Sequence, residues 1–283
     1  MARALEGLRA VADDADGFIL DLWGVVHGGE RPFPGVVETL RELRTAGKGI
    51  AFVTNAPVRR HHVASHLDAL GLADCYDALL TSGELTYQHL SDGHAGQRYY
   101  AVGPSWAKLL HDELPLERAM TVDAADLVLV VGLEDHRPHP DEYLPELETA
   151  QRCGLPLVCA NPDRVIVVQS GVYSWCAGAL ADHYEDLGGD VVWIGKPEPS
   201  IFRAAADALA VADPTRIVVV GDGLPTDIRG ANQFGARSVL VTRGIHARDL
   251  GIAAGDRAEV VAVRALAESH DARPDFVLAT LAW

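Results

Sequence analysis

Short apolar runs that each end in a polar residue constrain the fold of this chain more than any other feature. Residues 17–20 lead into Asp21, and residues 50–53 lead into Thr54 and Asn55. A stretch with apolar residues at helical spacing separates the two runs and stops at a glycine. This order of strand, helix and strand is typical of a parallel sheet that helices cover on both faces.

The same pattern returns in the last third of the chain. Residues 191–194 lead to Lys196, residues 217–220 lead to Asp222, and a helical pattern lies between them. We expect these runs to join the first two in one α/β core. Ligands of such sheets bind at the carboxyl ends of the strands, so the polar residues after the runs should line one site.

A second set of strand-like segments lies between these two halves, at residues 98–102, 127–133 and 156–160. These segments alternate with helical patterns of their own, which indicates a separate α/β domain inserted into the first. We therefore predict a core made of residues 1–81 and 191–283, with an inserted α/β domain at residues 82–190.

The charge and composition exclude several function classes. A formal net charge of −16 repels nucleic acid and anionic lipid, so neither is an expected partner. An anionic substrate then needs a local positive site, most simply a metal ion with one or two basic side chains. No apolar run reaches the roughly 18 residues of a membrane span, and the four cysteines form no C-x-x-C pair. We expect a cytoplasmic protein with reduced thiols.

Several motifs, taken together, resemble one known family. They are D-L-W-G-V-V-H-G-G at residues 21–29, F-V-T-N at 52–55, G-K-P-E-P-S-I-F at 195–202 and G-D-G-L-P-T-D-I-R-G-A at 221–231. Their order and spacing resemble subclass IIA of the haloacid dehalogenase superfamily, which includes phosphatases of the p-nitrophenylphosphatase type. The resemblance covers nearly the whole chain and implies a Rossmann-like core with an inserted cap domain.

The resemblance also implies a reaction. Asp21 would be a nucleophile that forms an aspartyl-phosphate, which water later hydrolyses. Mg2+ would be held by Asp21, Asp222, Asp227 and the backbone carbonyl of Trp23, and would offset the repulsion between the two anions.

Other matching positions would bind the substrate. Thr54 and Lys196 would contact the phosphoryl group or orient the nucleophile, and Asn55 would be a secondary contact. The cap's N-P-D-R motif supplies Asn161, Asp163 and Arg164 as further candidates. For Arg164, a salt bridge within the loop is an equally good interpretation.

One position departs from the family pattern. Its phosphatases carry an aspartate two residues after the nucleophile, where it protonates the leaving group and then activates water; here that residue is Trp23. An indole cannot exchange protons near neutral pH. His27 is the nearest titratable replacement, a role that a pKa near neutrality would suit, although it could merely line the cap entrance.

The leading hypothesis is therefore a Mg2+-dependent phosphohydrolase of a small phosphorylated metabolite, in which acid and base catalysis is altered or weak. The alternatives are a hydrolase of a carbon-halogen or carbon-phosphorus bond and a non-catalytic binder of a phosphorylated ligand. A homodimer is an open possibility. His62 and His66 stand four residues apart on an expected helix, and we interpret them as solvated because no third metal ligand is near in sequence.

Overall fold

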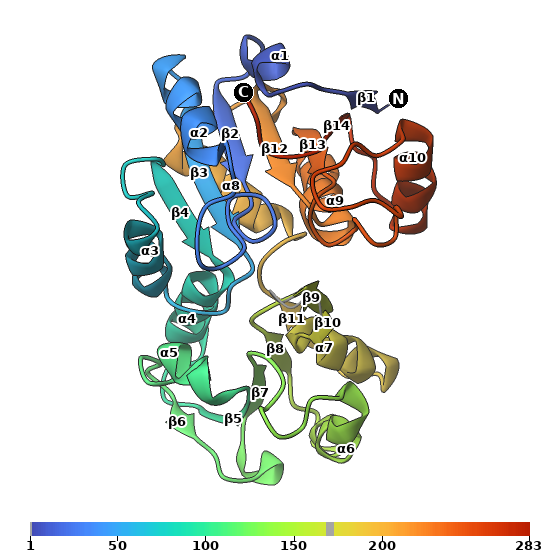
Figure 1. Ribbon diagram of the computed structural model, residues 1–283. Coiled ribbons are helices and arrows are strands. Elements are labelled where there is room, and N and C mark those ends of the chain that lie inside the picture. The colour runs from blue at the N-terminus through green and yellow to red at the C-terminus, as the bar shows by residue number, and fades with distance from the viewer. Residues whose placement is uncertain (1, 168–172) are drawn as a thin grey trace. The chain divides into compact units, whose positions relative to one another are not determined.

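The structure is a computed structural model that describes residues 2–167 and 173–283. The chain divides into two compact units, each with its own parallel sheet (Figure 1). The first comprises Met1–Thr54, Ala64–Leu80 and Lys196–Trp283, and the second comprises Asn55–Val63 and Thr81–Gly195. The predicted α/β class is confirmed.

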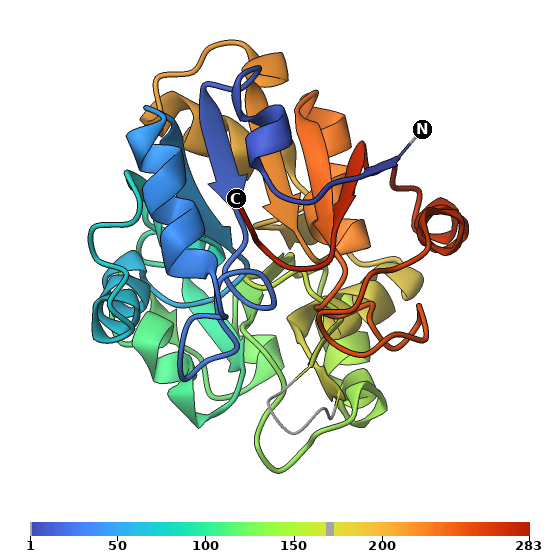
Figure 2. The same cartoon turned by 45° about the horizontal axis from the view of Figure 1, so that its top comes forward.

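The sheet of the first unit has seven strands in the order β1-β14-β13-β12-β2-β3-β4. Parallel pairing joins β1 to β14, β14 to β13, β13 to β12, β12 to β2, and β2 to β3. The strands are β1 (Arg3–Ala4), β2 (Gly17–Leu20), β3 (Gly49–Thr54), β4 (Ala78–Thr81), β12 (Ile217–Gly221), β13 (Arg237–Val241) and β14 (Phe276–Leu278). Figure 2 shows the central strands of this sheet pointing the same way, so their carboxyl ends share one edge.

The first unit's helices bury the apolar stripes that the sequence predicts. In α2, Val36, Leu40 and Leu43 are fully buried on one face. The helices are α1 (Arg9–Ala12), α2 (Val36–Thr45), α8 (Pro199–Ala208), α9 (Arg229–Phe234) and α10 (Val260–Ser269), with one π-helical turn at Leu224–Ile228 and a 3-10 helix at Pro214–Arg216. Helix α3 (Arg60–Ala69) contains the boundary between residues 63 and 64. Among the described residues, no helix is long and apolar enough to cross a bilayer.

The second unit contains a five-stranded parallel sheet in the order β11-β8-β7-β5-β6 and an antiparallel pair, β9 with β10. The strands are β5 (Arg98–Val102), β6 (Glu117–Arg118), β7 (Leu127–Val130), β8 (Leu157–Cys159), β9 (Val165–Val167), β10 (Tyr173–Trp175) and β11 (Val191–Trp193). The helices are α4 (Ser82–Gly93), α5 (Lys108–His111), α6 (Leu144–Arg152) and α7 (Ala177–Asp186), with 3-10 helices at Ser105–Ala107, Val122–Ala124 and Pro140–Tyr143.

Strand β11 corrects one sequence-based expectation. The pattern at residues 191–194 indicated a strand of the core, but β11 pairs with β8 in the second unit's sheet. A short apolar run followed by glycine is equally compatible with either parallel sheet, so the sequence pattern could not assign it.

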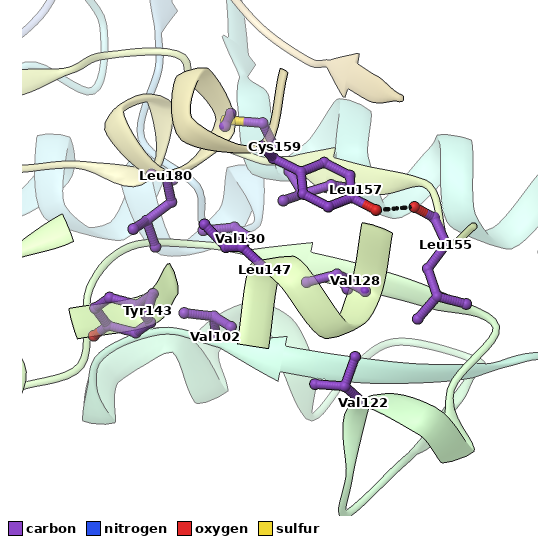
Figure 3. Packing of buried hydrophobic residues seen from close by; sticks show 14 of the residues in the cluster. Val102, Val122, Val128, Val130, Tyr143, Leu147, Leu155, Leu157, Cys159 and Leu180 are labelled. Carbon is purple, nitrogen blue, oxygen red and sulfur yellow. Dashed lines mark hydrogen bonds between the residues drawn. The ribbon is translucent and has the colours of Figure 1, made fainter. Parts of the chain in front are cut away.

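The core of the second unit is packed around two buried tyrosines. Figure 3 shows Val128 and Val130 of β7 and Leu147 of α6 packed in this cluster with Tyr143. The hydroxyl of Tyr184, the other fully buried tyrosine, donates a hydrogen bond to the Leu155 carbonyl at 2.5 Å. This hydrogen bond offsets the cost of desolvating the hydroxyl, so that the large ring can be buried.

Candidate active site

Asp21 lies directly after β2 at the carboxyl edge of the first sheet. Its backbone N–H donates to the Val220 carbonyl at 2.9 Å, which extends the ladder of β12 by one residue. Only 7% of Asp21 is exposed. The strand pairing therefore fixes the backbone from which this carboxylate projects.

Lys196 is the basic group of the site and is almost fully buried. Its Nζ donates to Asp21 Oδ1 at 2.5 Å, to Asp227 Oδ1 at 2.7 Å and to the Val53 carbonyl at 3.2 Å. Burial alone would lower the pKa of Lys196, but the charges of Asp21 and Asp227 raise it above its usual value. The lysine is therefore a permanent cation that holds two carboxylates in place.

The carboxylates of Asp21, Asp222 and Asp227 are buried together, with ligand oxygens that all lie within 4.8 Å of one another. Burial first, and then the neighbouring charges of Asp21 and Asp227, raise the pKa of Asp222 well above its ordinary value. One ammonium group cannot neutralise three carboxylates. The cluster is thus short of positive charge, and its all-oxygen donor set fits a hard divalent cation.

Two glycines make room for the Asp222 carboxylate. A Cβ on Gly24, which has φ +83°, would lie 2.1 Å from Asp222 Oδ2, and a Cβ on Gly244 would lie 1.8 Å from it. The same oxygen accepts the Ile245 N–H at 2.9 Å. Only glycine allows the backbone to approach this closely on both sides.

His246 is a further residue of this edge that the sequence analysis did not single out. Its Nε2 accepts the Leu224 N–H at 3.2 Å, and its Nδ1 lies 3.2 Å from Asp249 Oδ2. This contact ties the loop after β13 to the π-helical turn that carries Asp227. The sequence feature that could have pointed to His246 is the pair Gly244 and His246 shortly after the strand at Arg237–Val241.

Trp23 and His27 lie on the loop that follows Asp21. Their rings meet edge to face, with centroids 5.8 Å apart, and 36% of Trp23 is exposed. His27 is buried, and its Nδ1 accepts the Gly29 N–H at 3.1 Å. Burial, with a smaller effect of His66, lowers the pKa of His27 to about 4. His27 is therefore uncharged at neutral pH, and its pKa lies below the near-neutral value that would suit a general acid or base.

The remaining predicted site residues fall in both units. Thr54 ends β3 in the first unit and is buried. In the second unit, the Asn55 amide donates to Asp163 Oδ1 at 2.9 Å, and the Asp163 N–H donates to Asn161 Oδ1 at 3.1 Å. These three polar residues form one hydrogen-bonded group.

Arg164 is engaged within the second unit. Its Nε and Nη2 donate to the two carboxylate oxygens of Asp182 at 2.9 and 2.5 Å, and its guanidinium lies 4.7 Å from the Trp193 ring centroid. Arg59 likewise pairs with Glu84 and Glu113. From the sequence, a salt bridge and a substrate contact were equally good interpretations of Arg164. The structure shows a salt bridge, with Asp182 as the partner.

Family models match three overlapping stretches of the chain. Two models described as haloacid dehalogenase-like hydrolase match residues 18–114 and 84–235, and a related hydrolase-like model matches residues 193–283. The chain belongs to the haloacid dehalogenase-like hydrolases. Relatives that include nucleotide and aryl-phosphate phosphatases place the hydrolase in subclass IIA, as its motifs indicated.

Individual relatives support this assignment. The hydrolase is 31% identical over 246 residues to D-glycerol 3-phosphate phosphatase of Mycobacterium tuberculosis, an alignment that spans 84% of this chain and 66% of that protein. Its fold is similar to that of a haloacid dehalogenase-like family hydrolase from Brucella suis, with a TM-score of 0.82, 32% identity and coverage of 98% and 99% of the two chains. The glycerol phosphate phosphatase of Mycobacterium tuberculosis in complex with magnesium gives a TM-score of 0.67 at 28% identity and covers 94% of this chain and 76% of that one.

Proposed function

We propose that this hydrolase is a Mg2+-dependent phosphohydrolase of a small phosphorylated metabolite, which acts through an aspartyl-phosphate on Asp21. The observation that supports this most is the convergence of Asp21, Asp222 and Asp227 at one strand edge, with Lys196 bonded to two of them. The phosphatases among its relatives support the substrate class.

The ion would be held by the three carboxylates and the backbone carbonyl of Trp23. Mg2+ suits a site of oxygen donors that leaves positions for water and a phosphoryl oxygen, and the magnesium complex of the mycobacterial phosphatase supports this choice. When bound, the ion offsets the negative charge that builds up between nucleophile and phosphoryl group.

In the first step, a carboxylate oxygen of Asp21 bonds to phosphorus as the ester P–O bond breaks, and the leaving oxygen takes up a proton. Lys196 holds Asp21 in position and supplies a fixed positive charge beside it. Thr54 offers a hydroxyl at the same edge. In the second step, water attacks phosphorus, the bond to Asp21 breaks, and inorganic phosphate leaves.

Acid and base catalysis is the weak part of this mechanism. Because Nδ1 of His27 accepts the Gly29 N–H, the neutral ring carries its proton on Nε2 and can donate there but not accept. We therefore assign His27 the role of a hydrogen-bond donor on the loop, rather than the general base that the sequence suggested. Hydrolysis of the aspartyl-phosphate then lacks a side-chain base at the position of Trp23.

The second unit would select the substrate. Asn55, Asn161 and Asp163 form a connected polar group that a substrate could share. Arg164 uses three of its five N–H donors, two for Asp182 and one for the Pro162 carbonyl, so the others could bind a substrate without breaking the salt bridge. We also propose a cytoplasmic location, which the four free cysteines support. The homodimer remains a prediction, which light scattering in solution would test.

Two other functions make different predictions. In the superfamily that the sequence resembles, carbon-halogen hydrolysis needs no metal, so a dehalogenase would keep its activity in a chelator. A non-catalytic binder would retain phosphate affinity but release no product. The buried acidic cluster favours metal-assisted phosphoryl chemistry over both.

The test is release of inorganic phosphate from a panel of phosphorylated metabolites, with Mg2+ and with a chelator. We expect turnover only with Mg2+, and loss of turnover in Asp21→Asn, which keeps the side-chain volume but removes the nucleophile. Circular dichroism checks that the variant is folded. Turnover that persists in Asp21→Asn would rule out the covalent mechanism.

A further inference from the structure

A second group of side chains that could ligate a metal ion lies in the second unit. His61 and His62 are in the first turn of α3, and Glu113 follows α5. The Nε2 atoms of the two histidines lie 3.3 and 3.5 Å from the same oxygen, Glu113 Oε1. Each of the three offers a ligand atom within 4.8 Å of the others.

These separations suit one tetrahedral ion. Zinc binds imidazole nitrogen and carboxylate oxygen at about 2.0 to 2.2 Å, so two ligand atoms at a tetrahedral angle lie about 3.3 to 3.5 Å apart. The distances from Glu113 Oε1 to both histidines fall in this range. Two of the three ligand separations therefore already match one tetrahedral ion, and the third pair of ligand atoms lies within 4.8 Å.

The surroundings hold the carboxylate in place. Arg59 donates from Nη1 to Glu113 Oε2 at 2.6 Å, which leaves Oε1 directed at the histidines. Arg59 is itself bonded to Glu84 through Nε at 2.9 Å, and its guanidinium lies 3.5 Å from the Tyr87 ring centroid. Such outer contacts orient a metal ligand, although the positive charge of Arg59 also weakens the site.

We propose that His61, His62 and Glu113 form a binding site for a divalent transition-metal ion, of which Zn2+ fits best, with water at the fourth position. Two imidazoles and one carboxylate suit Zn2+ and Co2+, whereas Mg2+ prefers oxygen donors alone. The site thus differs in chemistry from the all-carboxylate cluster of Asp21. Its exposure, 58% for the His61 side chain and 34% for each of the others, gives an ion direct access from solvent.

The sequence analysis interpreted His62 and His66 as solvated, because no third ligand stood near them in sequence. The His66 ring packs edge to face on His27, with centroids 5.4 Å apart, and is not a member of the group formed by His61, His62 and Glu113. The third ligand, Glu113, is 51 residues further along the chain than His62 (113 − 62). Only the fold brings it to the helix.

The experiment titrates Zn2+ into full-length protein that contains saturating Mg2+, with binding followed by calorimetry, and repeats the titration with Co2+, whose visible absorption reports tetrahedral coordination. We expect one Zn2+ per chain. His62→Gln should weaken binding at least tenfold, and His61→Gln should act likewise. His136→Gln is the matched control, because His136 is an exposed histidine that lies 3.7 Å from one carboxylate, Glu134.

Binding at the acidic cluster is distinguished by Asp222→Asn, which should retain the Zn2+ site. Circular dichroism confirms that each variant is folded. Absence of Zn2+ binding in the Mg2+-saturated wild type would overturn the proposal. So would wild-type affinity in both His61→Gln and His62→Gln.

Discussion

At the scale of single residues, Trp23 has the largest consequence for chemistry. It occupies the position where the phosphatases that the sequence resembles carry an aspartate, and neither it nor the neutral His27 can act as a base there. General acid and base catalysis contributes roughly 100 to 10,000-fold, most of it for poor leaving groups. Aryl phosphates, which release a stable anion, should suffer least from the loss.

We therefore predict that the wild type cleaves aryl phosphates faster than alkyl phosphates, with a burst of product before slow turnover. Trp23→Asp should raise turnover of alkyl phosphates by at least about 10-fold, a modest part of the general acid-base contribution. Stopped-flow release of p-nitrophenol measures the burst. Equal rates on both substrate types without a burst would mean that another acid and base act in the site.

His111 makes stability depend on pH. Burial lowers its pKa to about 4, and its buried Nδ1 has no hydrogen-bond partner among the described residues. Between about pH 6.5, the usual pKa of an unfolded histidine, and pH 4, the unfolded chain binds a proton that the folded chain does not. Lowering the pH through this window therefore favours unfolding.

We predict that His111→Gln removes part of this dependence. Relative to the variant, the wild type should lose at most about 3 kcal/mol of unfolding free energy between pH 7 and pH 4, since each pKa unit corresponds to about 1.4 kcal/mol. Urea denaturation at several pH values measures the difference. A constant difference across the window would show that His111 titrates alike in both states.

At the scale of elements, the sequence predicted the parts of the site that strand ends define. Asp21, Thr54 and Asp222 follow apolar runs, so the parallel sheet alone brings them to one edge. The hydrogen bond from Ile245 to Asp222 was not predictable, because a backbone N–H is present at every residue and carries no signal. The pairing of Arg164 with a helix 18 residues away also depends on tertiary packing.

Gly244, in the loop after β13, allows a test of whether this loop positions the Asp222 carboxylate. In Gly244→Ala the new Cβ would lie 1.8 Å from Asp222 Oδ2, so the carboxylate or the loop must move. We predict at least tenfold weaker Mg2+ binding by calorimetry. Gly93→Ala is the control, because a Cβ there meets no atom within 4 Å and should leave Mg2+ affinity unchanged. Unchanged affinity in Gly244→Ala would mean that the loop does not position Asp222.

At the scale of the whole molecule, the buried acidic cluster links stability to the ion. Without a cation, the charges of Asp21, Asp222 and Asp227 repel one another in a dry environment. We predict that a chelator lowers the melting temperature of the wild type, and that Mg2+ at 100 times its dissociation constant adds about 2.7 kcal/mol of stability. Asp222→Asn should melt higher than the chelated wild type and respond less to Mg2+. A melting temperature of the wild type that is the same with and without Mg2+ would contradict this prediction.

The division of the chain also determines how such enzymes can be recombined. The backbone passes between the two units four times, after residues 54, 63, 80 and 195. A chimera that exchanged only residues 81–195 would keep residues 55–63 from the other parent. Arg59 would then face foreign residues in place of Glu84 and Glu113, and Asn55 would face one in place of Asp163. The second unit can therefore be transplanted intact only when both of its segments are moved together.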